Sequence, residues 1–111
     1  MELSTKEFRD WIEKLSGTHF PDTEIQIREY SKFRIKLRLV LSLDLFVEVF
    51  YAPQTEKASF TLIKEKERIF GIDNLGGWHH HPLGKPTNHV DIAEPELHEI
   101  FESLKSAKED T

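Results

Sequence analysis

The hydrophobic pattern of this 111-residue chain changes its period twice, and this change most constrains the fold. Near both ends, apolar residues recur at spacings of three and four, which is typical of one face of a helix. Between about residues 22 and 74 they alternate with polar residues or form short runs, which is typical of β-strands. The sequence therefore predicts one helix, a series of strands and a second helix.

The first helix is expected over about residues 4–16. Ser4 and Glu7 have the spacing of a capping box at its start, and Gly17 is a suitable stop. One face carries the apolar side chains Phe8, Trp11, Ile12 and Leu15. We expect this stripe, Trp11 included, to lie in the core.

The second helix is expected over about residues 93–108. Asp91 or Glu94 is placed to cap it, and Pro95 suits its first turn. Its apolar stripe consists of Leu97, Ile100, Phe101 and Leu104. It therefore has one face suited to the core, like the first helix.

Five strands are expected between the helices, at residues 25–28, 33–39, 44–51, 58–63 and 68–73. Residues 33–39, which start at Phe33, alternate strictly and suit a strand with one face in water. Residues 44–51 are apolar on both faces apart from Glu48, which suits a central strand. The connections are short, which favours antiparallel neighbours.

These elements predict a single two-layer α+β domain over residues 1–111. Its antiparallel meander of four to five strands would be flanked by the N-terminal and C-terminal helices, both on one sheet face. The second apolar face of the central strand then lacks a cover. Phe46 and Phe50 are candidates for a homodimer or partner interface on that face, and they fit the core equally well.

Composition narrows the classes of function. The chain has no Cys, which excludes disulfides, thiolate catalysis and Cys-based zinc sites and fits a cytoplasmic location. Its net charge of -5 argues against broad nucleic-acid binding, although residues 28–38 are basic. No apolar run reaches the length of a membrane span, and no signal peptide is expected. High charge with few labile residues is typical of thermophile-like composition.

Four of the six histidines lie in one stretch, residues 73–89, between the last strand and the second helix: His79, His80, His81 and His89. The stretch also contains Gly and Pro, so we expect a loop and neither a helix nor a central strand. Loops held by regular structure often carry function.

One hypothesis for this loop is metal binding. In an extended segment His79 and His81 point to one side and His80 to the other. His89 and Asp73 would complete a nitrogen and oxygen ligand set for zinc or another divalent transition metal. None of the standard zinc spacings is present, and a metal-free loop with solvated histidines fits the spacing equally well.

A second hypothesis is acid–base cleavage of RNA. Histidine suits both proton-transfer roles, and we assign them to His79 and His81. A cation must stabilise the phosphate, and Trp78 could stack on an unpaired base. The candidate phosphate contacts are Arg34, Arg38, Arg68 and Lys85.

A third hypothesis is structural. Asp73 and Asn74 favour a turn, two glycines supply unusual backbone angles, and Trp78 anchors the loop by packing inward. The histidines would then form local hydrogen bonds that order the segment.

The stretch Arg68-Ile69-Phe70-Gly71-Ile72-Asp73-Asn74, followed by His79-His80-His81-Pro82 and His89, resembles the TumE-like family of small prokaryotic toxins. The resemblance covers the layout of most of the chain. It implies a toxin paired with a helix-turn-helix antitoxin, with a ribonuclease-type activity. The positions that match the family's motif are Asp73, Asn74, His79, His80, His81 and His89.

Overall fold

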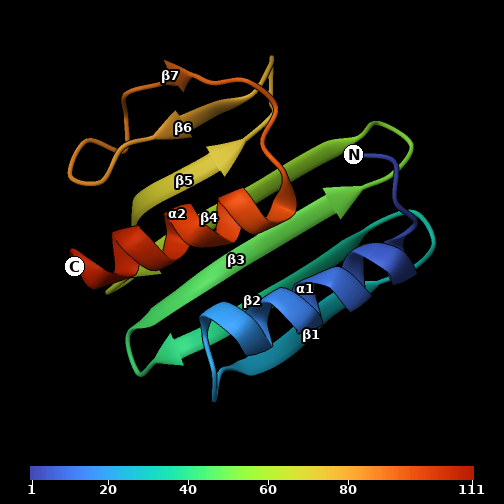
Figure 1. Ribbon diagram of the computed structural model, residues 1–111, viewed down its shortest axis with the longest axis horizontal. Coiled ribbons are helices and arrows are strands. Elements are labelled where there is room, and N and C mark those ends of the chain that lie inside the picture. The colour runs from blue at the N-terminus through green and yellow to red at the C-terminus, as the bar shows by residue number, and fades with distance from the viewer.

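The computed structural model describes residues 1–111 and shows two helices on one face of a seven-stranded antiparallel sheet (Figure 1). Each strand pairs with its neighbour in the chain, in the order β1 to β7. The predicted α+β meander is therefore confirmed, with more strands than expected. The elements are α1 (Thr5–His19), β1 (Glu24–Tyr30), β2 (Ile35–Ser42), β3 (Leu45–Ala52), β4 (Lys57–Lys64), β5 (Glu67–Asp73), β6 (His79–His81), β7 (Val90–Asp91) and α2 (Leu97–Glu109).

The two additional strands lie inside the predicted loop. His79–His81 forms β6, which pairs with β5 on one side and with β7 on the other. The expectation that this segment could not be a central strand is wrong, because the strand breakers flank the triplet. Gly76 and Gly77 form the preceding turn with φ values of 74° and 108°, and Pro82 follows β6.

The sheet face beneath the helices carries the core. Alternate residues of β2, β3 and β4 are fully buried there, and both helices contribute their apolar stripes. The Phe8 ring of α1 stacks on Tyr51 of β3 with ring centres 4.4 Å apart. The largest fully buried side chains include Phe8, Tyr51, Phe60, Phe101, Ile12, Leu37, Leu62 and Leu104. Neither helix is long and apolar enough to cross a membrane.

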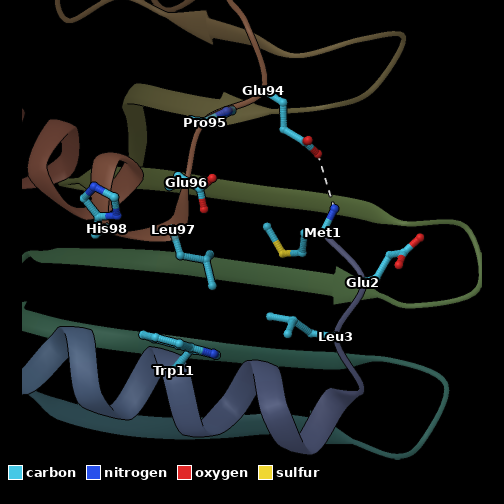
Figure 2. Close-up of a pocket in the computed structure, with 9 residues that line it drawn as sticks. All are labelled: Met1, Glu2, Leu3, Trp11, Glu94, Pro95, Glu96, Leu97 and His98. Carbon is cyan, nitrogen blue, oxygen red and sulfur yellow. Dashed lines mark hydrogen bonds and ion pairs between the residues drawn. The ribbon is translucent and has the colours of Figure 1, made fainter.

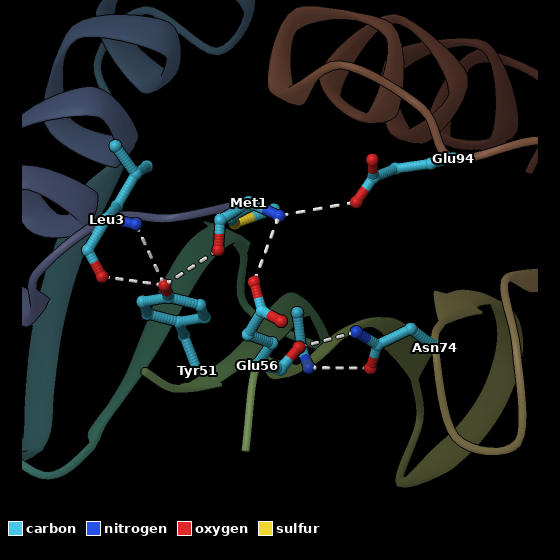
Figure 3. A network of polar contacts seen from close by, with 7 residues as sticks. Met1, Leu3, Tyr51, Glu56, Asn74 and Glu94 are labelled. Atoms are coloured by element: carbon cyan, nitrogen blue, oxygen red, sulfur yellow. Dashed lines mark hydrogen bonds and ion pairs between the residues drawn. The ribbon is translucent and has the colours of Figure 1, made fainter. Parts of the chain in front are cut away.

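The Tyr51 hydroxyl fixes the segment that precedes α1 (Figure 3). It lies 2.6 Å from the Leu3 carbonyl oxygen and accepts the Leu3 N–H at 3.1 Å. The Met1 carbonyl oxygen is 3.2 Å away. Burial raises the pKa of Tyr51 above its ordinary value of 10.0.

α1 begins as predicted, with a capping box in which Glu7 N–H donates to Ser4 Oγ and Ser4 N–H to the Glu7 carboxylate. The helix continues past Gly17, which is not its end. Trp11 is not in the core: it is 44% exposed. Phe8 and Ile12 fill the space above the sheet and leave Trp11 at the edge of the stripe.

α2 begins at Leu97, later than expected. Asp91 does not cap it, because this residue pairs with His79 in the sheet. The N-cap is Glu96, whose N–H donates to the Glu99 carboxylate at 2.8 Å. Pro95 therefore precedes the helix, and the expected cap at Glu94 is also wrong.

The face that the helices leave open is only partly covered. Phe46 and Phe50 of β3 are half-buried there, and the Arg38 guanidinium lies 3.9 Å from the centre of the Phe46 ring. Arg38 also approaches Glu48 at 3.9 Å. Phe33, expected at the start of a strand, precedes β2 and is 52% exposed.

Candidate functional site: a histidine–carboxylate cluster

The strand register gathers three polar side chains on the sheet face opposite the helices. Asp73 of β5 is the partner of His79, and Gly71 is the partner of His81. His80 pairs with Ile72 and points to the helix side, where its ring centre is 6.4 Å from that of Phe70. The predicted separation of His79 and His81 from His80 is therefore confirmed.

Asp73 bridges the two buried histidines. His79 Nε2 lies 3.0 Å from Asp73 Oδ1, and His81 Nε2 lies 2.9 Å from Asp73 Oδ2. The remaining ring nitrogen of each histidine meets a main-chain carbonyl oxygen. His79 Nδ1 is 2.9 Å from that of Gly77, and His81 Nδ1 is 3.0 Å from that of Pro86.

His89 completes the cluster from the connection between β6 and β7. Its ring centre is 4.8 Å from that of His79 and 4.5 Å from that of His81. Each of the three histidines offers one ring nitrogen, and these atoms lie within 4.8 Å of one another. His89 is exposed and makes no hydrogen bond with its ring, so it is the least constrained member.

No helix covers this cluster, yet His79 is 7% and His81 is 3% exposed. The segment after β6 folds back, so that the Pro86 carbonyl holds His81 in place. Gly71 lies against the His81 ring: a Cβ atom there would be 3.6 Å from His81 Cδ2. Neither Gly71 nor Pro86 was a predicted site residue, and only the pairing of the strands reveals them.

Two of the predicted phosphate contacts, Arg68 and Lys85, are held differently. Arg68 donates from Nη2 to the Pro86 carbonyl at 3.0 Å, the same oxygen that His81 Nδ1 contacts. Lys85 is exposed in the turn that precedes Pro86. The Arg68 guanidinium is thus anchored beside His81, while the Lys85 ammonium is in solvent.

Asn74 joins the site to the β3–β4 hairpin (Figure 3). Its side-chain oxygen accepts the Ala58 N–H at 2.8 Å, and its amide donates to the Glu56 carbonyl. Both ends of the side chain are therefore engaged with main chain. In this structure Asn74 holds the end of β5, and with it Asp73, rather than facing the histidines.

The remaining predicted contacts lie elsewhere. Arg34 pairs with Glu29 beside the β1–β2 connection. Arg38 is on β2, which at about 4.8 Å per strand is roughly 19 Å from β6. Trp78 is half-buried against the core. The structure therefore does not bring Arg34 or Arg38 to the cluster, and the Trp78 ring packs inward as the structural hypothesis expects.

No family model matches the sequence, and no curated protein or solved structure matches it either. The resemblance to the TumE-like toxins therefore stays a prediction from the residues. The chemistry of the cluster itself is what points to a function.

Proposed function

We propose that Asp73, His79, His81 and His89 bind a divalent transition metal ion. Three imidazoles and one carboxylate form a nitrogen and oxygen donor set suited to zinc and its neighbours in the first transition row. The observation that carries the proposal is the hydrogen bonding of the two buried rings. A main-chain carbonyl can only accept, so each Nδ1 that meets one must carry the proton.

A neutral imidazole with its proton on Nδ1 has a lone pair on Nε2. The Nε2 lone pairs of His79 and His81 then face the oxygen lone pairs of Asp73 at 3.0 and 2.9 Å. Such contacts repel unless a positive charge lies between the atoms. Protonating both rings would place two charges in rings 5.0 Å apart with one carboxylate to offset them. A single divalent ion removes the conflict with both histidines neutral.

The carbonyl contacts of Gly77 and Pro86 also orient the two histidine rings for metal binding. Histidine ligands of metals nearly always donate their other ring N–H to a carbonyl or carboxylate, which fixes the tautomer and the ring orientation. Ligand atoms around an ion held at about 2.0–2.1 Å lie about 3.0–3.4 Å apart. The contacts from Asp73 to His79 and His81 are close to this range, whereas the three histidines span up to 4.8 Å. We expect the exposed His89 to move inward when an ion binds.

Metal analysis tests the proposal directly. Protein purified without a histidine tag should carry or take up close to one equivalent of zinc, and cobalt should give the visible absorption of a low-coordinate site. The His79→Ala/His81→Ala double variant should bind neither metal. The matched control is His19→Ala/His98→Ala, because those two histidines lie outside the cluster. Uptake below about a tenth of an equivalent, or equal binding by the double variant, would overturn the proposal.

We infer as a second candidate that the cluster acts on an RNA phosphodiester in a toxin of a toxin–antitoxin pair. The anchored Arg68 guanidinium beside His81 favours an anionic substrate. Among the three histidines of the cluster, His89 has a free ring and solvent access, so it is our candidate for proton transfer with substrate. The predicted acid–base roles of His79 and His81 would require their bonds to Asp73 or to the carbonyls to open.

Expression and RNA-cleavage assays distinguish this candidate from metal binding alone. If it is correct, growth inhibition should be lost with Arg68→Gln and with His89→Ala, while Arg34→Gln remains toxic. A neighbouring gene for a helix-turn-helix protein that relieves toxicity would support the pairing. Growth inhibition that persists in the His79→Ala/His81→Ala variant would show that toxicity does not depend on the cluster.

A further inference from the structure

A recess lies on the helix-covered face of the sheet, between the N-terminal parts of α1 and α2 (Figure 2). It has a volume of about 330 Å³. Trp11 projects from α1 on one side, Leu97 and His98 begin α2 on the other, and the segment from Met1 to Leu3 borders the third. We refer to this recess as the interhelical groove.

The wall of the interhelical groove is apolar and firmly built. Leu3 and Leu97 are half-buried and pack against the core. The main chain of Leu3 is tied to the Tyr51 hydroxyl by two contacts of 2.6 and 3.1 Å (Figure 3). The 44% exposure of Trp11 leaves a large, rigid ring at the surface. Tryptophan in such a setting is the residue type most enriched among binding hot spots.

The rim of the groove is acidic. Three glutamates line it, namely Glu2, Glu94 and Glu96. Glu94 lies 3.2 Å from the Met1 amino group, whereas Glu2 and Glu96 have no cationic partner. On the outer side of Trp11, a smaller recess is lined by Glu7 and by Asp10, which is paired with Lys6 at 3.0 Å. The Lys14 ammonium lies 5.2 Å from the Trp11 ring centre. The groove thus combines an apolar wall with unpaired negative charge.

We propose that the interhelical groove docks a basic amphipathic segment of a partner protein. An apolar side chain of that segment would pack on Trp11 and Leu97. Its Lys or Arg residues would meet Glu2 and Glu96. Parallel placement of the two helices suits a segment laid between them, as in other helix-in-groove complexes (Figure 1). Charge complementarity selects this occupant over an acidic or uncharged one. The proposal does not depend on the histidine cluster, which lies on the other face.

Calorimetric titration of the full chain with three synthetic peptides tests this proposal. The probes have equal length and are a leucine–lysine helix, its leucine–glutamate counterpart and a serine–lysine version without apolar side chains. At about 0.15 M salt, where long-range attraction is screened, only the leucine–lysine peptide should bind well. In a Trp78→Phe background, which leaves Trp11 as the single tryptophan, binding should also change the fluorescence.

Two variants and a matched control locate the binding. Trp11→Ala should weaken binding of the leucine–lysine peptide at least about ten-fold, as expected for a hot spot. Glu2→Gln/Glu96→Gln should weaken it by a similar factor. Glu65→Gln/Glu67→Gln changes the net charge equally at the β4–β5 turn and should have no effect. Circular dichroism verifies that each variant is folded.

Four outcomes would overturn the proposal. Equal losses in the two glutamate pairs would show that net charge alone attracts the peptide. Comparable binding of the leucine–glutamate peptide would remove the charge selection. Unchanged binding by Trp11→Ala, or no binding of any probe, would show that the groove does not dock such a segment.

Discussion

The two faces of the sheet are buried by different means. Beneath α1 and α2, Val49 and Phe60 are fully buried in one apolar cluster to which both helices contribute. On the opposite face, Asp73, His79 and His81 are nearly as buried, but a connecting segment encloses them and main-chain carbonyls accept hydrogen bonds from the two rings. Apolar packing has no direction, whereas a hydrogen bond fixes the positions of two atoms.

This difference indicates that the two faces of the sheet have different roles. The helix-covered face supplies most of the free energy of folding, and the open face holds donor atoms at set distances. A substitution on the first face should therefore change stability, whereas one on the second should change ligand binding more than stability. Four substitutions, given in order of decreasing effect on stability, test that distinction.

Phe101→Ala should have the largest effect on stability. The Phe101 ring of α2 is fully buried beside the end of α1, with the Phe20 ring centre 6.1 Å away. Truncation leaves a cavity, and we expect a loss of about 3–5 kcal/mol in the free energy of unfolding. Urea denaturation followed by circular dichroism measures it. A loss of less than about 1 kcal/mol would mean that the helix face is not the main source of stability.

Asp73→Asn should reduce stability less but remove metal binding. The change keeps the size of the side chain and removes the charge that faces His79 and His81. With zinc present at about 100 times the wild-type dissociation constant, the variant should be about 2.7 kcal/mol less stable, because it loses the stabilisation that the bound ion provides. Zinc affinity should fall by about 100-fold or more, which is beyond the effect of outer-sphere residues. Unchanged zinc affinity with a large drop in stability would contradict the comparison of the two faces.

Tyr51→Phe tests the contribution of the Tyr51 hydroxyl, a polar group on the otherwise apolar helix-covered face. Removing the hydroxyl frees the Leu3 main chain and should cost about 1 kcal/mol near neutral pH. The raised pKa of Tyr51 also predicts a pH dependence. Its contribution to stability is present below pH 10 and is lost as the pH rises through the folded-state value, because the unfolded chain ionises first.

Thermal unfolding of the wild type and Tyr51→Phe between pH 8 and 11 measures that pH dependence. The wild type should lose more stability on the alkaline side than the variant. Tyr30→Phe is the control, since Tyr30 is 43% exposed. Parallel curves for wild type and Tyr51→Phe would show that the hydroxyl is not responsible.

His80→Ala should have the smallest effect of the four. His80 belongs to the same triplet as the cluster but points toward α2, where it lines a shallow recess with Glu99 and Glu102. We expect a change in stability of less than about 1 kcal/mol, and zinc affinity should stay within about three-fold of the wild type. A loss of metal comparable to that of His79→Ala would mean that β6 does not keep its alternation in solution.

Local patterns were sufficient to predict most of the fold. The two-residue period is a property of consecutive side chains, and it located β1 to β5 to within about three residues and identified the helix-covered face. β6 and β7 were not predicted, because strands of three and two residues are too short to show a period. Their pairing depends on the neighbouring strand. Trp11 was misplaced because the width of the buried stripe depends on how α1 sits on the sheet.

The site was only partly predictable for the same reason. Alternation placed His79 and His81 together, because that relation involves neighbouring residues. The bridging position of Asp73 depends on the register between β5 and β6. The contacts of Pro86 with Arg68 and His81 depend on a turn in the connection, which no local pattern specifies. Asn74 matches the family motif and the ribonuclease-type activity that the resemblance implies, yet its side chain engages the main chain of the β3–β4 hairpin, which no local pattern reveals.

The sequential order of the strands has a consequence for synthesis of the protein. Each strand pairs with the one made just before it, so a growing chain can extend the sheet in the order in which it leaves the ribosome. β1 to β5 are complete before the histidine triplet emerges, and His89 follows later still. A polypeptide arrested before residue 79 would hold five strands of the sheet and none of the imidazoles of the cluster.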